Sequence, residues 1–314
     1  MNNKHHRKRN ATVQATVLLP IRHTSRIHNR RKFAHLGMSS AEQKQQERDH
    51  QTSASNKPTQ WKKTIAGMLI AAILLPLVGW FALAILGNVW IDNKQLNTFY
   101  TQIQEASHLP NGQPVVRTID MPSYVADTLL AIEDHRYYLH PGIDPIGIAR
   151  SIWVDFVKGK KAQGGSTVTM QLARNMFLTH EKTYIRKIKE IAISANLELR
   201  YTKQELMDMY VNKVYFGHGK YGIESAARFY FGKTTKRNGD IPTINLAETA
   251  VLVGLLKAPE HYSPFKNKDL AERRQSVVLH RMNTLGWISD SELEKALNTP
   301  LIYANHTVKP NKTA

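Results

Sequence analysis

The chain has 314 residues and no cysteine, which excludes disulfides, thiolate metal sites and a cysteine nucleophile. It carries 43 Lys and Arg against 25 Asp and Glu, a net charge of +18. Such an excess is typical of a protein with a polyanionic partner: nucleic acid, a phosphate-bearing substrate or an anionic membrane. The charge is uneven, because residues 1–63 hold 14 basic and 3 acidic residues, a net +11, and the remainder holds +7.

The first 91 residues divide into a basic segment and an apolar one. Residues 1–63 are polar and without clear periodicity, which predicts a disordered tail. Residues 64–91 contain no charged side chain and exceed the roughly 20 residues that cross a bilayer, so they predict an uncleaved transmembrane helix. Lys62 and Lys63 precede this run and Asp92 follows it. The positive-inside rule therefore predicts a single-pass protein of the bacterial inner membrane, with a cytoplasmic N-terminus and a periplasmic main domain.

The remainder predicts one mainly α-helical domain. Residues 92–121 have the composition of a polar linker with one short strand in "QPVVRTIDM", and residues 301–314 that of a C-terminal tail. Between them, at 122–300, apolar residues recur at helical spacing, and Thr202 with Glu205 has the spacing of a capping box. Strands do not alternate with helices. Helices are expected at 123–133 and within 143–159, 164–177, 181–201, 202–217, 223–233, 245–259 and 269–286.

The first candidate site is the stretch "AIEDHRYYLHPG", in which Glu133 and Asp134 end a helix. Carboxylates at a helix C-terminus oppose the macrodipole, which favours cations there. Their position therefore costs some stability. This cost is the reason to look for a function at the pair.

A second candidate lies on the helix at 181–200, where Arg186 and Lys187 stand about one turn from Glu190. Taken alone, the pattern favours a solvent-exposed ion-pair triad of little energetic value. The alternative is an anion site in which two cations bind phosphate and the carboxylate orients them or holds a divalent metal.

A third candidate is "QGGSTVTMQLARN". Its paired glycines allow close backbone approach, and its hydroxyl groups precede a helix start, as in an oxyanion or phosphate cradle. A Gly-Gly turn that simply caps a helix explains the same residues. The Ser-x-x-Lys string that begins at Ser263 is discounted as an acylation site, because a four-residue string recurs by chance and few residues follow it.

Five stretches taken together resemble one known family. "EDHRYYLHPG", "GGSTVTMQLARN", "RKIKEIAISANLE", "KQELMDMYVNKVYFG" and "RRQSVVLHRM" occur in this order, between about Pro122 and Leu297. They resemble the motifs of family 51 glycosyltransferases, the peptidoglycan transglycosylases found in class A penicillin-binding proteins and as monofunctional enzymes. The resemblance implies a lysozyme-like, two-lobed helical domain behind one N-terminal transmembrane helix.

The resemblance also implies an activity: polymerisation of lipid II into glycan strands with release of undecaprenyl pyrophosphate. Glu133 would be the general base, and Glu190 the second catalytic carboxylate and the ligand of any Mg²⁺ or Mn²⁺. The implied substrate-binding residues come from the motifs: Asp134, His140, Gly165, Ser166, Thr167, Gln171, Arg174, Asn175, Arg186, Lys187 and Asn212. Asp134 is interpreted as structural rather than as a second catalytic carboxylate. The chain departs from the family pattern at Tyr137, Met170, Arg174 and Lys182.

The implied partners are lipid II, the nascent glycan strand and the membrane, with no specific nucleic acid. Since no transpeptidase sequence follows, we expect a monofunctional enzyme that hands glycan to penicillin-binding transpeptidases and to proteins of the divisome or elongasome. Two other functions stay open: a lysozyme-like lytic muramidase, against which the cation cluster argues, and a degenerate transglycosylase that acts as a membrane scaffold, which Met170 and the long tail motivate.

Overall fold

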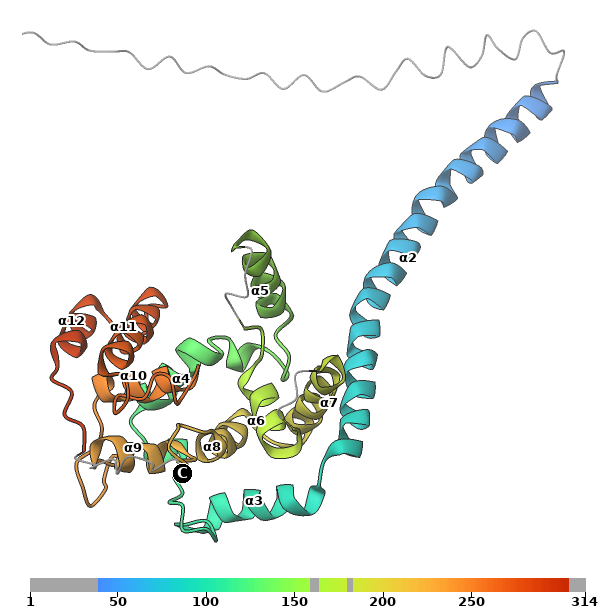
Figure 1. Cartoon of the computed structure of the whole chain (residues 1–314). Coiled ribbons are helices and arrows are strands. Elements are labelled where there is room, and N and C mark those ends of the chain that lie inside the picture. The colour runs from blue at the N-terminus through green and yellow to red at the C-terminus, as the bar shows by residue number, and fades with distance from the viewer. Residues whose placement is uncertain (1–38, 159–163, 180–182, 305–314) are drawn as a thin grey trace, which may run out of the picture. The chain divides into compact units, whose positions relative to one another are not determined.

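The computed structural model describes residues 39–158, 164–179 and 183–304. The chain forms two compact units, Met1–Leu74 and Leu75–Ala314. Across the described residues, all regular elements are helices, and strand-like pairing is limited to isolated bridges (Figure 1). The prediction of a mainly α-helical domain is therefore confirmed.

The helices of the described residues follow one another along the chain and are joined by turns and loops. They are α2 (Ser40–Gly87), η1 (Asn88–Trp90), α3 (Asn93–Glu105), η2 (Thr118–Asp120), α4 (Ser123–Glu133), η3 (Tyr137–Leu139), α5 (Pro145–Lys158), α6 (Val168–Phe177), α7 (Tyr184–Arg200), α8 (Lys203–Lys213), α9 (Ile223–Phe231), α10 (Leu246–Leu255), α11 (Lys268–Thr284) and α12 (Asp290–Asn298). Helices form in all the predicted ranges from 123 to 286. The capping box of Thr202 with Glu205 is present at the start of α8. Helix α12 is additional.

Helix α2 begins at Ser40, inside the segment that the sequence predicts as a tail, where Ala, Glu, Gln and Lys favour a helix. Ser39 and Glu42 cap this start, since the Ser39 amide donates to the Glu42 carboxylate at 2.8 Å. The part at Gln60–Trp90 is long and apolar enough to cross a membrane. This part agrees with a single-pass anchor. Which side each end faces stays a prediction.

The segment at 92–121 contains a helix that the sequence analysis missed. Helix α3 is capped by Asp92, which accepts from the Gln95 amide at 3.0 Å, and it buries Leu96 and Ile103 in the core. The strand predicted at 113–121 does not form. Val116 instead pairs its amide with the side chain of Asn212, at 3.1 Å, so a side chain takes the place of a neighbouring strand.

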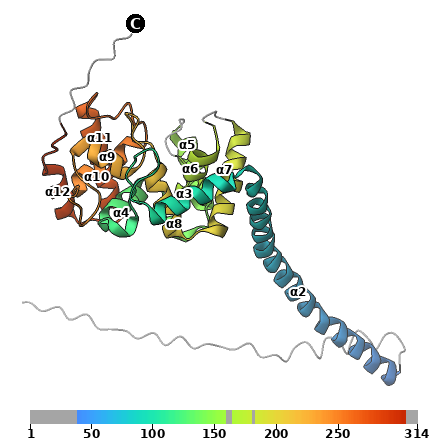
Figure 2. The ribbon, with the colours of Figure 1, turned by 90° about the horizontal axis from the view of Figure 1, so that it is seen from below.

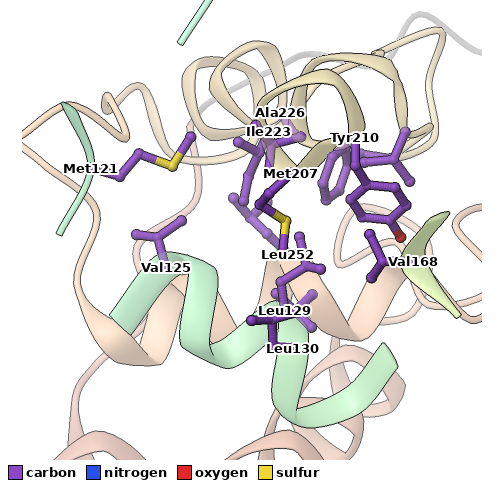
Figure 3. Packing of buried hydrophobic residues seen from close by; sticks show 14 of the residues in the cluster. Met121, Val125, Leu129, Leu130, Val168, Met207, Tyr210, Ile223, Ala226 and Leu252 are labelled. Atoms are coloured by element: carbon purple, nitrogen blue, oxygen red, sulfur yellow. The ribbon is translucent and has the colours of Figure 1, made fainter. Parts of the chain in front are cut away.

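The core of the second unit is arranged in two groups of helices. Helices α4, α10, α11 and α12 pack together in one group, and α6, α7 and α8 in the other. Helix α10 is buried from Ala247 to Leu255, which explains its largely apolar sequence. Leu129 of α4, Met207 of α8 and Leu252 of α10 meet where the groups join (Figure 3). Helix α4 ends near this junction, so its last residue lies beside α6.

The end of α2 packs closely on α7. Asn196 donates its side-chain amide to the Ala84 carbonyl at 2.8 Å, and both residues are buried. A Cβ atom at Gly87 would lie 2.1 Å from the Ala192 carbonyl oxygen, so the two backbones touch there. Trp80 donates its indole N–H to the Pro141 carbonyl at 3.1 Å. These contacts fix the last turns of α2 against α7 and against the loop that follows η3.

Candidate active site

Glu133 is the last residue of α4 and is partly buried. Gln171 of α6 donates its amide to Glu133 Oε2 at 2.7 Å, and the Tyr210 hydroxyl donates to the other end of Gln171 at 3.1 Å. Burial raises the pKa of Glu133, while the bond from Gln171 and the charges of Arg274 and Arg174 oppose that rise. The carboxyl group is thus held in one orientation and binds a proton more tightly than an exposed one.

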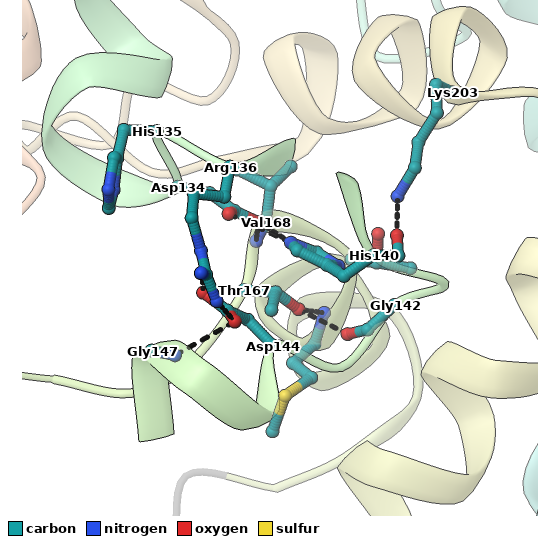
Figure 4. Close-up of polar contacts among 12 residues, drawn as sticks. Asp134, His135, Arg136, His140, Gly142, Asp144, Gly147, Thr167, Val168 and Lys203 are labelled. Atoms are coloured by element: carbon teal, nitrogen blue, oxygen red, sulfur yellow. Dashed lines mark hydrogen bonds and ion pairs between the residues drawn. The ribbon is translucent and has the colours of Figure 1, made fainter. Parts of the chain in front are cut away.

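Asp134 is buried, and it also lines the cavity that is described below. His140 Nε2 lies 3.0 Å from its carboxylate, and the Val168 amide at the start of α6 donates to it at 3.1 Å (Figure 4). The side chains of Asp134 and His140 are both buried. Asp134 therefore ties the loop after η3 to the N-terminus of α6, where the helix dipole favours a negative charge.

Thr167 and the ion pair of Lys203 with Glu198 hold the loop after η3 in place. Thr167 caps α6 by accepting from the Met170 amide at 3.1 Å, and its hydroxyl donates to the Gly142 carbonyl at 2.6 Å. Lys203 donates to the His140 carbonyl and to Glu198, both at 2.7 Å. The sequence analysis missed Glu198, Lys203 and Tyr210 because no motif spacing joins them to the loop.

A small cavity opens beside Glu133. Asp144 shapes it by pairing with Arg136 and by accepting from the Gly147 amide at 2.8 Å, which caps α5 (Figure 4). The residues that line it include Glu133, His135, Arg150, Gly165, Ser166 and Thr167. The structure thus brings the first and third candidate stretches together at one cavity, as the resemblance implies.

The carboxylate of the triad on α7 is buried although the Lys187 side chain is 38% exposed, so the interpretation as a solvent-exposed ion-pair triad is wrong. The Glu190 side chain is only 1% exposed and pairs with Arg186 and, at 2.9 Å, with Lys187. Lys187 also donates to the Ser166 hydroxyl at 2.7 Å, which joins the triad to the cavity wall. A buried carboxylate that holds two cations beside a cavity keeps both positive charges in place for an anion.

The other residues predicted for the site do not all line the cavity. Arg174 lies on α6, where its charge acts on Glu133, and Asn175 follows it, partly exposed. Met170 is fully buried, so this departure from the family pattern changes the interior and not the cavity surface. Lys182 lies outside the described residues. Asn212 is buried and bonds to the Val116 and Asp208 backbone, apart from the cavity.

The donor atoms around Glu190 do not match the predicted metal site. Among the described residues, no group of three or more His, Asp or Glu side chains is arranged to hold an ion. Both oxygens of Glu190 are already engaged, one by Arg186 and the other by Lys187. A divalent ion at Glu190 would have to displace one of these cations. The residues present therefore do not form a fitting site, and the metal stays a prediction.

The Ser-x-x-Lys string forms no nucleophile. Ser263 is fully buried and lies 2.8 Å from the His218 ring, while Lys266 pairs with Glu260 at 2.5 Å. The serine and the lysine thus have separate partners.

Comparison with known proteins identifies the family. The family described as Transglycosylase matches residues 100–283. A putative transglycosylase of Cupriavidus necator is 38% identical over 239 residues, which cover 76% of this chain and 98% of that protein. Penicillin-binding protein 1F of Bacillus subtilis is 37% identical over 253 residues, or 78% of this chain and 34% of the relative.

Other relatives are also much longer than the matched region. Penicillin-binding protein 1A of Haemophilus influenzae is 42% identical over 194 residues, which are 62% of this chain and 22% of that protein. The crystal structure of a penicillin-binding protein 1A from the same organism aligns with a TM-score of 0.35 at 22% identity, over 62% of this chain and 18% of that one. The chain thus spans about a third or less of these penicillin-binding proteins. It belongs to the transglycosylase family and carries a peptidoglycan glycosyltransferase domain.

Proposed function

We propose that this protein polymerises lipid II into glycan strands, with Glu133 as the general base. One observation carries the proposal: the Glu133 carboxyl group, with a raised pKa, lies on the same cavity as Ser166, which Lys187 contacts at 2.7 Å. A base and an anion site on one cavity suit a transfer reaction in which a hydroxyl attacks and a phosphate leaves.

In the proposed step, the C4 hydroxyl of the incoming GlcNAc attacks C1 of the MurNAc that ends the growing chain. Its proton passes to the ionised Glu133. The new C4–O–C1 bond forms as the bond from C1 to the pyrophosphate oxygen breaks, with inversion at C1, and the electron pair leaves on undecaprenyl pyrophosphate. Burial makes Glu133 a stronger base, and Gln171 holds its Oε2, which leaves Oε1 to accept the proton.

Lys187 and Arg186 would stabilise the negative charge that develops on the leaving pyrophosphate. Glu190 holds both cations from a buried position, so they need little reorganisation when the charge appears. Mg²⁺ or Mn²⁺ at Glu190 remains a proposal for the chelator experiment below. No step here depends on it.

The proposed setting is the inner membrane, with one span and the catalytic domain in the periplasm. One helix among the described residues is long and apolar enough to cross a membrane, which supports this arrangement because the lipid-linked substrates lie in the same membrane. The match to nearly the full length of the Cupriavidus protein supports a stand-alone enzyme. Such an enzyme would pass its glycan to separate penicillin-binding transpeptidases of the divisome or elongasome.

Incubation of the purified full chain with lipid II tests the proposal. Wild type should form polymer and release undecaprenyl pyrophosphate, with and without chelator if no metal is needed. Glu133→Gln should lower the rate by about 10²–10⁴-fold, as for loss of a general base. Glu190→Gln should also lower it, and Glu294→Gln on the exposed face of α12 is the matched control.

Three results would contradict the proposal. Cleavage of preformed glycan without polymer synthesis would favour a muramidase. Full activity of Glu133→Gln would remove the general base. Absence of polymer from wild type, together with cell-wall complementation by Glu133→Gln, would favour a scaffold.

A further inference from the structure

A second groove lies on the far side of the domain from the cavity at Glu133. Helices α3 and α5 lie on opposite sides of α6 in Figure 1, and in Figure 2, seen from below, α3 crosses in front of α6. Two cavities of about 370 and 380 Å³ adjoin along α3 and share Phe99, Gln102 and Lys213. A third, of about 490 Å³, continues past Asn111, Gln113 and Tyr221. Each has the size of a small-ligand site, and together they form one elongated groove.

Lys213 is the residue in this groove whose environment indicates a bound ligand. It is partly buried, lies over the Phe99 ring at 5.6 Å, and has no carboxylate partner among the described residues. Burial lowers its pKa, as expected for a cation that no acid compensates. Asp92 is the acidic residue on the described walls, and it already caps α3. A half-buried, unpaired cation favours an anion that enters the groove.

The other walls offer the contacts that sugars and amides use. Tyr221 is 50% exposed and is backed by Tyr215, with ring centroids 4.9 Å apart, so one face of a supported ring is open. Gln102, Asn111 and Gln113 add carboxamide groups along the same wall, although Gln113 Nε2 already donates to the Asn212 carbonyl at 2.6 Å and Asn111 Oδ1 accepts from the Gln113 amide at 3.1 Å. An amphipathic ring beside amide donors and acceptors suits a ligand with apolar sugar faces, hydroxyls and N-acetyl groups.

We infer that this groove binds finished peptidoglycan strands, with Lys213 holding a carboxylate of the stem peptide and Tyr221 stacking on the sugar. The identity of the occupant rests on the proposed function, because the product of that reaction is a sugar polymer that carries an acidic peptide. An elongated groove far from Glu133 fits a strand that has already left the catalytic cavity. Binding there retains the product near the enzyme.

The test is the binding of uncrosslinked peptidoglycan strands to the full chain in detergent. Two probes are used: intact strands and strands from which an amidase has removed the peptides. Lys213→Gln should weaken binding of intact strands about tenfold, the value of one charge-assisted hydrogen bond, and leave stripped strands unaffected. Tyr221→Ala should weaken the binding of both intact and stripped strands. Lys213→Arg should restore binding, and Lys295→Gln on the exposed face of α12 is the charge-matched control.

The variants leave the catalytic cavity unchanged, so strand binding there contributes equally to each measurement. Thermal unfolding of each variant separates misfolding from a loss of binding, and Lys213→Arg provides the folded comparison. Equal binding of intact strands by wild type and Lys213→Gln would overturn the inference. So would equally tight binding of polyglutamate, which indicates an acidic protein segment, or of single-stranded DNA, which indicates charge alone.

The same proteins, assayed with lipid II, distinguish the two proposals. Lys213→Gln should keep the wild-type initial rate of polymerisation. If wild type forms polymer but strands bind independently of Lys213, the groove inference fails and the proposed function stands. If wild type forms no polymer, the proposed function fails, and the binding results with prepared strands still decide whether the groove recognises them.

Discussion

The bond from Gln171 to Glu133 gives a sharp test of the catalytic base. At 2.7 Å it stabilises the ionised carboxylate, and no other hydrogen bond to Glu133 is present among the described residues. Gln171→Leu removes the donor and keeps a side chain of similar size. The pKa of Glu133, already raised by burial, should rise further, because the ionised form loses its partner while the protonated form loses little.

The size of the effect follows from the energy of such a bond. A hydrogen bond to a charged group contributes about 1.5 kcal/mol or more, which is about tenfold in the proton-binding equilibrium. A base that must be ionised is active above its pKa, so a higher pKa costs activity on the acid side. We expect kcat/KM on the acid limb to fall about tenfold and the plateau at higher pH to be retained.

The assay is the pH dependence of kcat/KM for lipid II polymerisation, with variants compared at each pH. Tyr210→Phe removes the hydroxyl that donates to Gln171 at 3.1 Å and should shift the acid limb in the same direction by less. Asn175→Ala, on the same helix, is the control and should leave the acid limb in place. An acid limb that is unmoved in Gln171→Leu, or moved to lower pH, would refute Glu133 as the base.

Four further predictions concern stability, each measured by thermal unfolding in detergent. Glu133→Gln should raise the free energy of unfolding by about 1 kcal/mol at neutral pH, because a desolvated carboxylate with a raised pKa destabilises the fold above that pKa. Glu190→Gln should lower it by about 1–3 kcal/mol, because two cations lose their buried partner. Gly87→Ala should lower it by about 1–3 kcal/mol through a clash with an α7 carbonyl, whereas Gly79→Ala meets nothing within 4 Å. Asn212→Ala should lower it by about 2–4 kcal/mol with KM unchanged, because three buried hydrogen bonds to backbone are lost.

Each of these has an outcome that contradicts it. A less stable Glu133→Gln would mean that the carboxylate is well solvated or paired. An unaffected Glu190→Gln would mean that the triad is hydrated like a surface pair. Equal effects of the two glycine substitutions would show that α2 does not pack on α7 at Gly87. A raised KM with normal stability in Asn212→Ala would restore the substrate-binding role that the sequence predicts.

The sequence alone determined the helical class and the main helix positions. Helix formation depends on local spacing of apolar residues and on caps, so the ranges of α4 to α11 and the capping box at Thr202 could be predicted. The same locality let five motifs identify the family. Local spacing did not predict α3, because its two buried residues, Leu96 and Ile103, lie in a polar stretch. It also predicted a strand that does not form, since the side chain of Asn212, from a distant part of the chain, takes the place of a neighbouring strand.

Only the tertiary structure decided what the charged residues do. Sequence spacing placed Arg186 and Lys187 beside Glu190 but could not tell a solvated triad from a buried one, because burial depends on what packs over a helix. Nor could spacing find Tyr210 behind Gln171, or Lys213 over the Phe99 ring, since these contacts join different elements. The local pattern therefore gave the elements and the family, and contacts between distant segments set the environment, and with it the chemistry, of each side chain.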